Sequence, residues 1–135
     1  MRVFEIVRID SKGRIILPSS IRDSLGLPKG MYAMLIADSD KKEVRITPFA
    51  DPEAKLIEFI IELYDVPGAL ARVATLLSEH KVDLLSTESR TLSRGDLAEW
   101  HAIADISKCI CELQELKQKI EKGAIVKRVE LHSFP

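Results

Sequence analysis

The side chains that most often carry out covalent or metal chemistry are few in this sequence and are not grouped at ligand spacing. Cys109 and Cys111 lie two residues apart, where neither helix nor strand geometry favours a disulfide between them. No second cluster of Cys or His accompanies them, so a zinc site is not expected. We interpret both cysteines as ordinary small side chains at the start of a helix, in a protein of the reduced cytoplasm. His80 is expected to cap or solvate the end of a helix rather than to bind a metal, whereas His101 and His132 have no partner at ligand spacing.

Enzymatic activity is not expected from the remaining polar residues. The sequence holds no Gly-rich phosphate loop and no nucleophile motif, and Asp65 and Asp83 have no evident basic or nucleophilic partner. We therefore predict a non-enzyme that needs no cofactor and no metal. No apolar run approaches the roughly 18 residues that a membrane span requires, and the first residues carry no signal-peptide pattern, so no membrane partner is predicted.

The charge of the chain differs between its two parts. The net charge of −1 divides into +3 for residues 1–50, with nine basic and six acidic side chains, and −4 for residues 51–135, with eleven and fifteen. A mildly basic segment followed by an acidic one is compatible with a nucleic-acid-binding module joined to a different domain. Pro48 and Pro52, with Asp51 and Glu53, mark the boundary as a short, stiff link.

The first domain, residues 1–50, is predicted to hold four short strands and one short helix. The strands are expected at 3–9, 15–17, 31–37 and 44–47, with a polar turn at 38–42. A short helix carrying Ile21, Leu25 and Leu27 is expected to be capped by Ser19 or Ser20 and closed by Gly26 in the left-handed conformation. So small a fragment buries too little surface to be stable alone, and we expect it to dimerise.

Residues Val7–Pro18, which read V-x-I-D-x-x-G-R-I-x-L-P, and Ile21–Leu27, which read I-R-x-x-L-G-L, resemble the AbrB/SpoVT-like family of swapped-hairpin domains. The resemblance implies a dimeric β-barrel that binds double-stranded DNA. Its DNA-facing positions correspond here to Arg8, Lys12, Arg14 and Arg22, and such side chains neutralise phosphates or bind a guanine edge. The alternative left open is a solvated turn in which Arg14 pairs with Asp10.

The second domain, residues 51–135, is predicted to have the order βαββαβ. Alternating apolar residues predict strands at 56–64, 82–92, 97–106 and 125–131, and helical spacing predicts helices at 69–77 and 110–120. This order is typical of a ferredoxin-like sandwich, with an antiparallel sheet and both helices on one face. The whole chain is thus expected to be α+β.

The motif D-V-P-G-A-L at Asp65–Leu70, between the first strand and the first helix, resembles the ACT domain, a regulatory module that usually binds an amino acid at a dimer interface. The resemblance implies ligand contacts at Asp65, Val66, Gly68, Ala69, Leu70 and Asp83. The helix start there offers free N–H groups that can hold a carboxylate. The alternative is a purely structural turn in a dimerising platform.

The two resemblances together predict a DNA-binding transcription regulator whose ACT domain senses a small ligand, an amino acid. The protein is expected to be a homodimer or a higher homo-oligomer. The alternative is a regulatory or dimerising subunit that binds no DNA and controls an enzyme of amino-acid metabolism.

Overall fold

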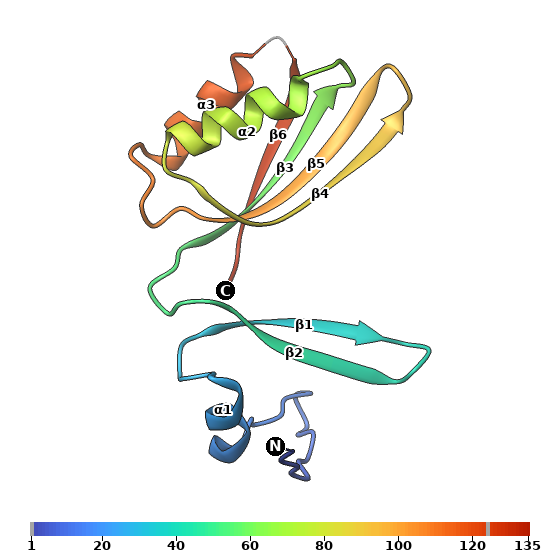
Figure 1. The fold of residues 1–135 in the computed structure, drawn as a ribbon, viewed down its shortest axis with the longest axis vertical. Coiled ribbons are helices and arrows are strands. Elements are labelled where there is room, and N and C mark those ends of the chain that lie inside the picture. The colour runs from blue at the N-terminus through green and yellow to red at the C-terminus, as the bar shows by residue number, and fades with distance from the viewer. Residues whose placement is uncertain (1, 124) are drawn as a thin grey trace. The chain divides into compact units, whose positions relative to one another are not determined.

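The computed structural model describes residues 2–123 and 125–135, and they form two compact units, Met1–Glu53 and Ala54–Pro135. The division lies between residues 53 and 54, whereas the sequence analysis predicted it between residues 50 and 51. Both units combine helices with antiparallel sheets, so the predicted α+β class is confirmed (Figure 1). Within the described residues no helix is long and apolar enough to span a membrane.

The first unit contains one helix, α1 (Ser19–Leu25), and one hairpin of β1 (Tyr32–Asp38) and β2 (Glu43–Ala50). The Asp38 carboxylate accepts the N–H groups of Asp40 and Lys41 and so holds the tight turn of the hairpin. Gly26 ends α1 with φ 67°, the left-handed conformation that the sequence predicted. The expected serine cap is wrong: Pro18 is the N-cap, and no side chain caps the helix.

The two strands expected at 3–9 and 15–17 are absent from the single chain. Between them lies a turn in which Asp10 donates its N–H to Arg14 O at 2.9 Å and accepts that of Gly13 at 3.0 Å, but the flanking arms form no ladder and the described residues close no barrel. A strand is stable only when a neighbour accepts and donates its backbone hydrogen bonds. The single chain offers these arms no such neighbour.

The second unit follows the predicted order. Its elements are β3 (Leu56–Tyr64), α2 (Ala69–Glu79), β4 (Asp83–Ser93), β5 (Leu97–Asp105), α3 (Leu113–Glu121) and β6 (Val126–Ser133). The sheet order is β4-β5-β3-β6 with every neighbouring pair antiparallel, which is the ferredoxin-like arrangement. Both helices cover one face of this sheet (Figure 1). The predicted start of the second helix at Ile110 is wrong, because Ile110 lies in the preceding loop and is 68% exposed.

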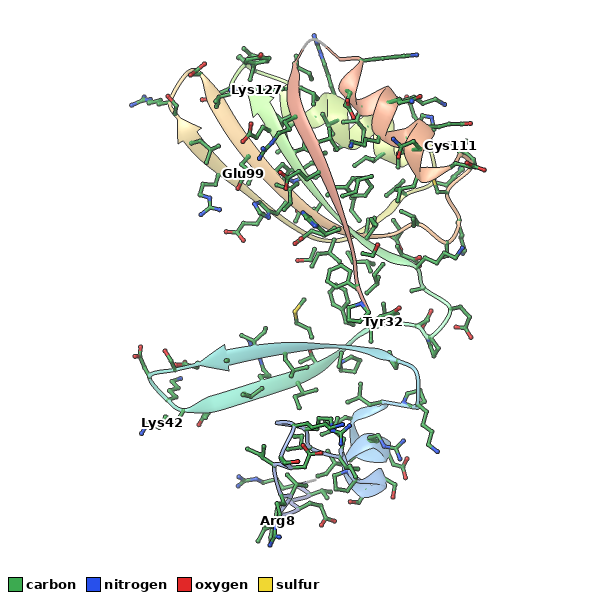
Figure 2. The ribbon with its side chains drawn as sticks, turned by 180° about the vertical axis from the view of Figure 1, so that it is seen from behind. Arg8, Tyr32, Lys42, Glu99, Cys111 and Lys127 are labelled. Carbon is green, nitrogen blue, oxygen red and sulfur yellow. The ribbon has the colours of Figure 1, made fainter. Side chains whose placement is uncertain are left out.

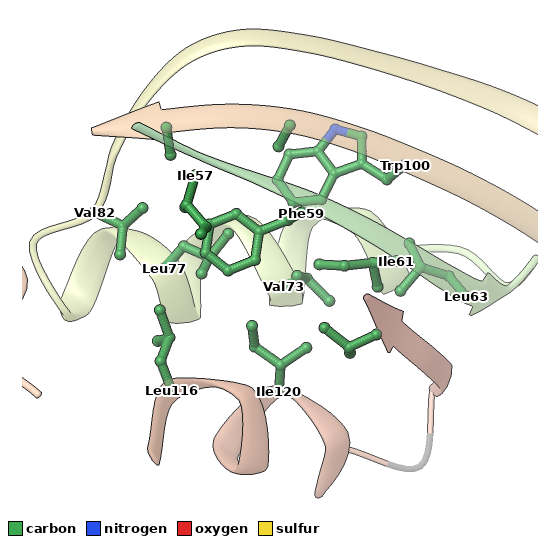
Figure 3. Packing of buried hydrophobic residues seen from close by; sticks show 13 residues of the cluster. Ile57, Phe59, Ile61, Leu63, Val73, Leu77, Val82, Trp100, Leu116 and Ile120 are labelled. Carbon is green, nitrogen blue, oxygen red and sulfur yellow. The ribbon is translucent and has the colours of Figure 1, made fainter. Parts of the chain in front are cut away.

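The core of the second unit lies between the helices and the sheet. Phe59 and Ile61 of β3 pack with Leu77 of α2 and with Leu116 and Ile120 of α3, and all five are buried (Figure 3). Burying one such side chain contributes roughly 1.5–3 kcal/mol. No side-chain nitrogen or oxygen of the described residues is buried without a hydrogen bond.

Candidate functional site

A cavity of about 200 Å³ lies where β3 ends and α2 begins. One wall is the turn of Asp65 and Val66 with the first residues of α2, and the other is the far end of the β4–β5 hairpin. Its lining consists of Leu63, Tyr64, Asp65, Val66, Ala69, Leu70, Ser89, Arg90, Thr91, Ala98, Glu99 and Trp100. The volume is below the roughly 300–1,000 Å³ of sites for drug-sized molecules and suits a smaller ligand.

The start of α2 presents unpaired backbone donors beside this cavity. Gly68 is the N-cap with φ 82°, and no side chain caps the helix. The first helical hydrogen bond runs from Arg72 N–H to Gly68 O at 3.0 Å, so the N–H groups of Leu70 and Ala71 have no helical acceptor. Together with the positive end of the helix dipole, such groups favour a bound carboxylate.

Asp65 connects the turn to the β4–β5 hairpin. Its Oδ2 accepts the N–H of Gly95 at 2.9 Å, and its own N–H donates to Asp96 O at 2.8 Å. The carboxylate therefore has a structural role, yet its second oxygen has no hydrogen-bond partner among the described residues. That oxygen leaves a negative acceptor at the edge of the cavity.

The structure brings four of the six predicted ligand residues together. Asp65, Val66, Ala69 and Leu70 line the cavity, whereas Gly68 is not part of its wall. Asp83 lies at the opposite end of β4, where its Cα partner on β5 is Asp105.

The sequence did not identify the β4–β5 wall of the cavity. The register pairs Ser89 with Trp100 and Thr91 with Ala98, so these side chains share the helix-covered side of the sheet. The sequence of Ser89–Thr91 alone does not indicate a binding wall, because only the pairing of β4 with β5 places these residues near the turn after β3.

Arg90 and Glu99 belong to the strand segments that form this wall, but their side chains lie on the opposite face of the sheet, because neighbouring residues of a strand alternate between its faces. Arg90 Nη2 lies 3.4 Å from Glu99 Oε1, and His101 Nε2 lies 2.6 Å from the same oxygen. The hydrogen bond from His101 lowers the pKa of Glu99. The charged groups of Arg90 and Glu99 therefore lie outside the cavity.

A larger groove of about 490 Å³ lies elsewhere, between α2, α3 and the start of β6. Its walls are mainly apolar, with Val73, Leu76 and Ile120 among them, and they include none of the predicted ligand residues. The smaller cavity is the better candidate, because it combines unpaired helix donors with a carboxylate.

The predicted DNA-facing cations of the first unit differ in their hydrogen-bond partners and in their exposure. Arg14 Nε binds Asp10 Oδ2 at 2.8 Å, which is the ion pair of the alternative interpretation. The N–H groups of Arg14 and Lys12 also donate to Asp10 Oδ1, and the hydrogen bonds from Arg14 hold the pKa of Asp10 below its ordinary value. Arg22 Nε donates to Leu17 O at 3.1 Å, whereas Arg8 is exposed (Figure 2).

The first unit exposes most of its apolar side chains. Among its described residues Leu27 alone is buried. Eleven large apolar residues are exposed there: Val3, Phe4, Ile6, Val7, Ile9, Ile15, Ile16, Leu25, Leu35, Ile36 and Val44. An exposed apolar surface of this extent is typical of an interface with another chain.

No protein-family model matches the chain, and no curated protein matches it. Among solved structures, the ACT domain from GTP pyrophosphokinase of Chlorobium tepidum has 17% sequence identity and a TM-score of 0.49, over 62% of this chain and 91% of that one. The C-terminal domain of the MgtC protein from Mycobacterium tuberculosis has 11% identity and a TM-score of 0.48, over 62% of this chain and 92% of that one. The fold assignment above rests on the connectivity and strand order of the second unit.

Proposed function

We propose that the protein is a homodimeric DNA-binding regulator whose second unit binds an amino acid in the cavity at the start of α2. The observation that supports the ligand most directly is the position of opposite charges around this cavity. Leu70, whose N–H group has no helical acceptor, and Asp65, whose carboxylate keeps one oxygen without a partner among the described residues, both line it.

An α-amino acid complements both groups. Its carboxylate accepts from the helix start, and its ammonium group donates to the free oxygen of Asp65. The buried ring of Trp100, with Leu63 and Ala98, forms an apolar wall for a small side chain. The volume of about 200 Å³ favours a small amino acid over a nucleotide or a larger cofactor.

DNA binding is proposed for the first unit from its charge and its sequence motif. Residues 1–50 carry +3, and a two-fold dimer doubles that charge. The exposed apolar residues support the dimer, since a second copy supplies both a cover for them and strand partners for 3–9 and 15–17. The ligand then changes DNA affinity only to the extent that it binds two arrangements of the dimer unequally.

A matched pair of variants tests the ligand site. Asp65→Asn keeps an oxygen for Gly95 N–H but removes the charge that binds the ammonium group, and Asp83→Asn makes the same change at the other end of β4. Isothermal titration with the twenty amino acids should identify a ligand that binds Asp65→Asn at least about tenfold more weakly than wild type, since charge-assisted hydrogen bonds are the strong ones. Asp83→Asn should bind normally. Loss of binding in Asp83→Asn alone, or no binding by any amino acid, would reject the proposed site.

One observation favours the alternative function, a regulatory subunit that binds no DNA. Asp10 already neutralises Arg14, so fewer cations are free for phosphates than the sequence indicated. Binding of promoter DNA across a salt series distinguishes the two functions, because counterion release requires contacts with phosphates. Affinity that is absent, or that does not change with salt, would support the alternative.

A further inference from the structure

The two cysteines form a sulfur pair that the sequence did not predict. Cys109 Sγ and Cys111 Sγ lie 3.9 Å apart in the loop before α3, and both residues are half-buried. The residue between them, Ile110, is 68% exposed. The chain therefore directs the two thiols to one side and the intervening side chain to the other, as an extended segment does. Cys111 is labelled beside the start of α3 in Figure 2.

The loop is anchored on both sides of the pair. Cys109 N–H donates to Ile106 O at 3.0 Å, and Ile110 N–H donates to His80 O, at the end of α2, at 3.2 Å. Both cysteines pack against the core of the second unit. The two sulfurs are thus held close together before any ligand binds, which lowers the cost of ordering them.

The distance between the sulfurs fits a shared metal ion better than a disulfide. A disulfide requires the sulfurs to approach to about 2.05 Å. With metal–sulfur bonds of about 2.3 Å, the separation of 3.9 Å corresponds to an S–metal–S angle of about 116°. That angle is close to trigonal geometry, and it leaves a third position open to an external thiol.

We propose that Cys109 and Cys111 bind one Cu(I) ion as a bidentate thiolate pair. Soft thiolate ligands select Cu(I), which accepts low coordination numbers, whereas structural Zn²⁺ requires four ligands. No group of three or more His, Cys, Asp or Glu residues suited to a metal occurs in the described part of the chain, so the protein supplies only these two. On binding, two S–H bonds break, two protons pass to solvent and two S–Cu bonds form, with no change in oxidation state.

Two charged side chains act on the Cys111 thiol. Burial, and then the hydrogen bond with Cys109, raise the pKa of the Cys111 thiol. Lys119 favours the thiolate of Cys111 and Glu115 opposes it. Lys119 Nζ also lies 3.1 Å from His80 Nε2.

The test is an anaerobic titration of the reduced protein with Cu(I) presented as its bicinchoninate complex. Wild type should remove one Cu(I) per chain, and X-ray absorption should show sulfur ligands at about 2.3 Å. Cys109→Ser and Cys111→Ser should each bind Cu(I) at least about 100-fold more weakly, since one thiolate alone cannot chelate. Ser107→Ala, a change in the same loop, should bind like wild type. Circular dichroism of the copper-free variants verifies that they remain folded.

Several results would overturn the proposal. Full binding by either single cysteine variant would show that the pair does not act as a chelate, and weakened binding in Ser107→Ala would place the ion elsewhere. Equal affinity for Zn²⁺, or copper coordinated by nitrogen and oxygen, would indicate a different set of ligands. Less than one Cu(I) for each reduced wild-type chain would reject the site itself.

Discussion

Asp10 is the residue whose substitution best tests the proposed DNA surface. It accepts the N–H groups of Lys12 and Arg14 through Oδ1, and it pairs with Arg14 Nε through Oδ2. Asp10→Asn retains an oxygen for the two backbone donors and removes the charge that neutralises Arg14. The turn should persist, while one guanidinium per chain, and two per dimer, becomes available to phosphates.

The magnitude follows from counterion release. Each added phosphate contact steepens the slope of log K against log salt by about 0.9, so two contacts steepen it by about 1.8. The affinity lost between about 50 mM and about 200 mM salt should then be about 12-fold greater for Asp10→Asn than for wild type. Fluorescence anisotropy with a labelled fragment of the protein's own promoter region measures both slopes.

Three further variants make this experiment decisive. Arg8→Ala, which removes an exposed cation, should flatten the slope by about 1.8, and Arg14→Ala should change it less because Arg14 is already paired. The double variant Asp10→Asn/Arg14→Ala should have the slope of Arg14→Ala. A slope for Asp10→Asn equal to that of wild type, or a steep slope retained in the double variant, would refute this account of the surface.

The other predictions concern the stability of the two units. Leu77→Ala should lower the free energy of unfolding, measured with urea, by about 2–5 kcal/mol, because the Leu77 side chain is fully buried. Leu70→Ala should lower it by under about 1 kcal/mol, because Leu70 is half-exposed. Equal losses in the two variants would contradict the core described here. Gly26→Ala should lower the free energy of unfolding by about 1 kcal/mol, because φ is 67° there, and should therefore lower the thermal midpoint of the protein; an unchanged midpoint would contradict that conformation. Asp105 accepts the N–H groups of Ser107 and Lys55, and although burial acts to raise its pKa, these hydrogen bonds lower it below the ordinary value. The ionised Asp105 therefore stabilises the fold above about pH 4, and this stabilisation is lost as pH falls through the lowered pKa. Below about pH 4 the urea midpoint of wild type should fall more steeply with pH than that of Asp105→Asn. Parallel curves for the two proteins would refute this role of Asp105.

The second unit was predictable because its signals are local and agree with one another. Ile57, Phe59, Ile61 and Leu63 alternate along β3, and the structure buries all four. The site was predictable only in part, since the turn at Asp65 is a continuous motif, whereas Ser89 and Thr91 join it through a strand register that no short stretch of sequence encodes.

The first unit was less predictable from the single chain. The apolar pattern of 3–9 and 15–17 indicates strands, but pairing is a property of two segments, and the described chain supplies only the turn between them. The pairing of Arg14 with Asp10 was left open because a spacing of four residues permits an ion pair without requiring it. The distance between the sulfurs of Cys109 and Cys111 depends on how the loop is anchored to His80, which the sequence does not reveal.

The near absence of buried side chains in the first unit has a consequence for how a cell would use this protein. If ordering that unit requires two chains to meet, the concentration of the ordered dimer rises with the square of the monomer concentration while most chains are monomers. Newly made or diluted chains would expose Phe4 and Ile6 to proteases, which act on unordered segments. The rate of synthesis would then decide how much of the first unit is ordered.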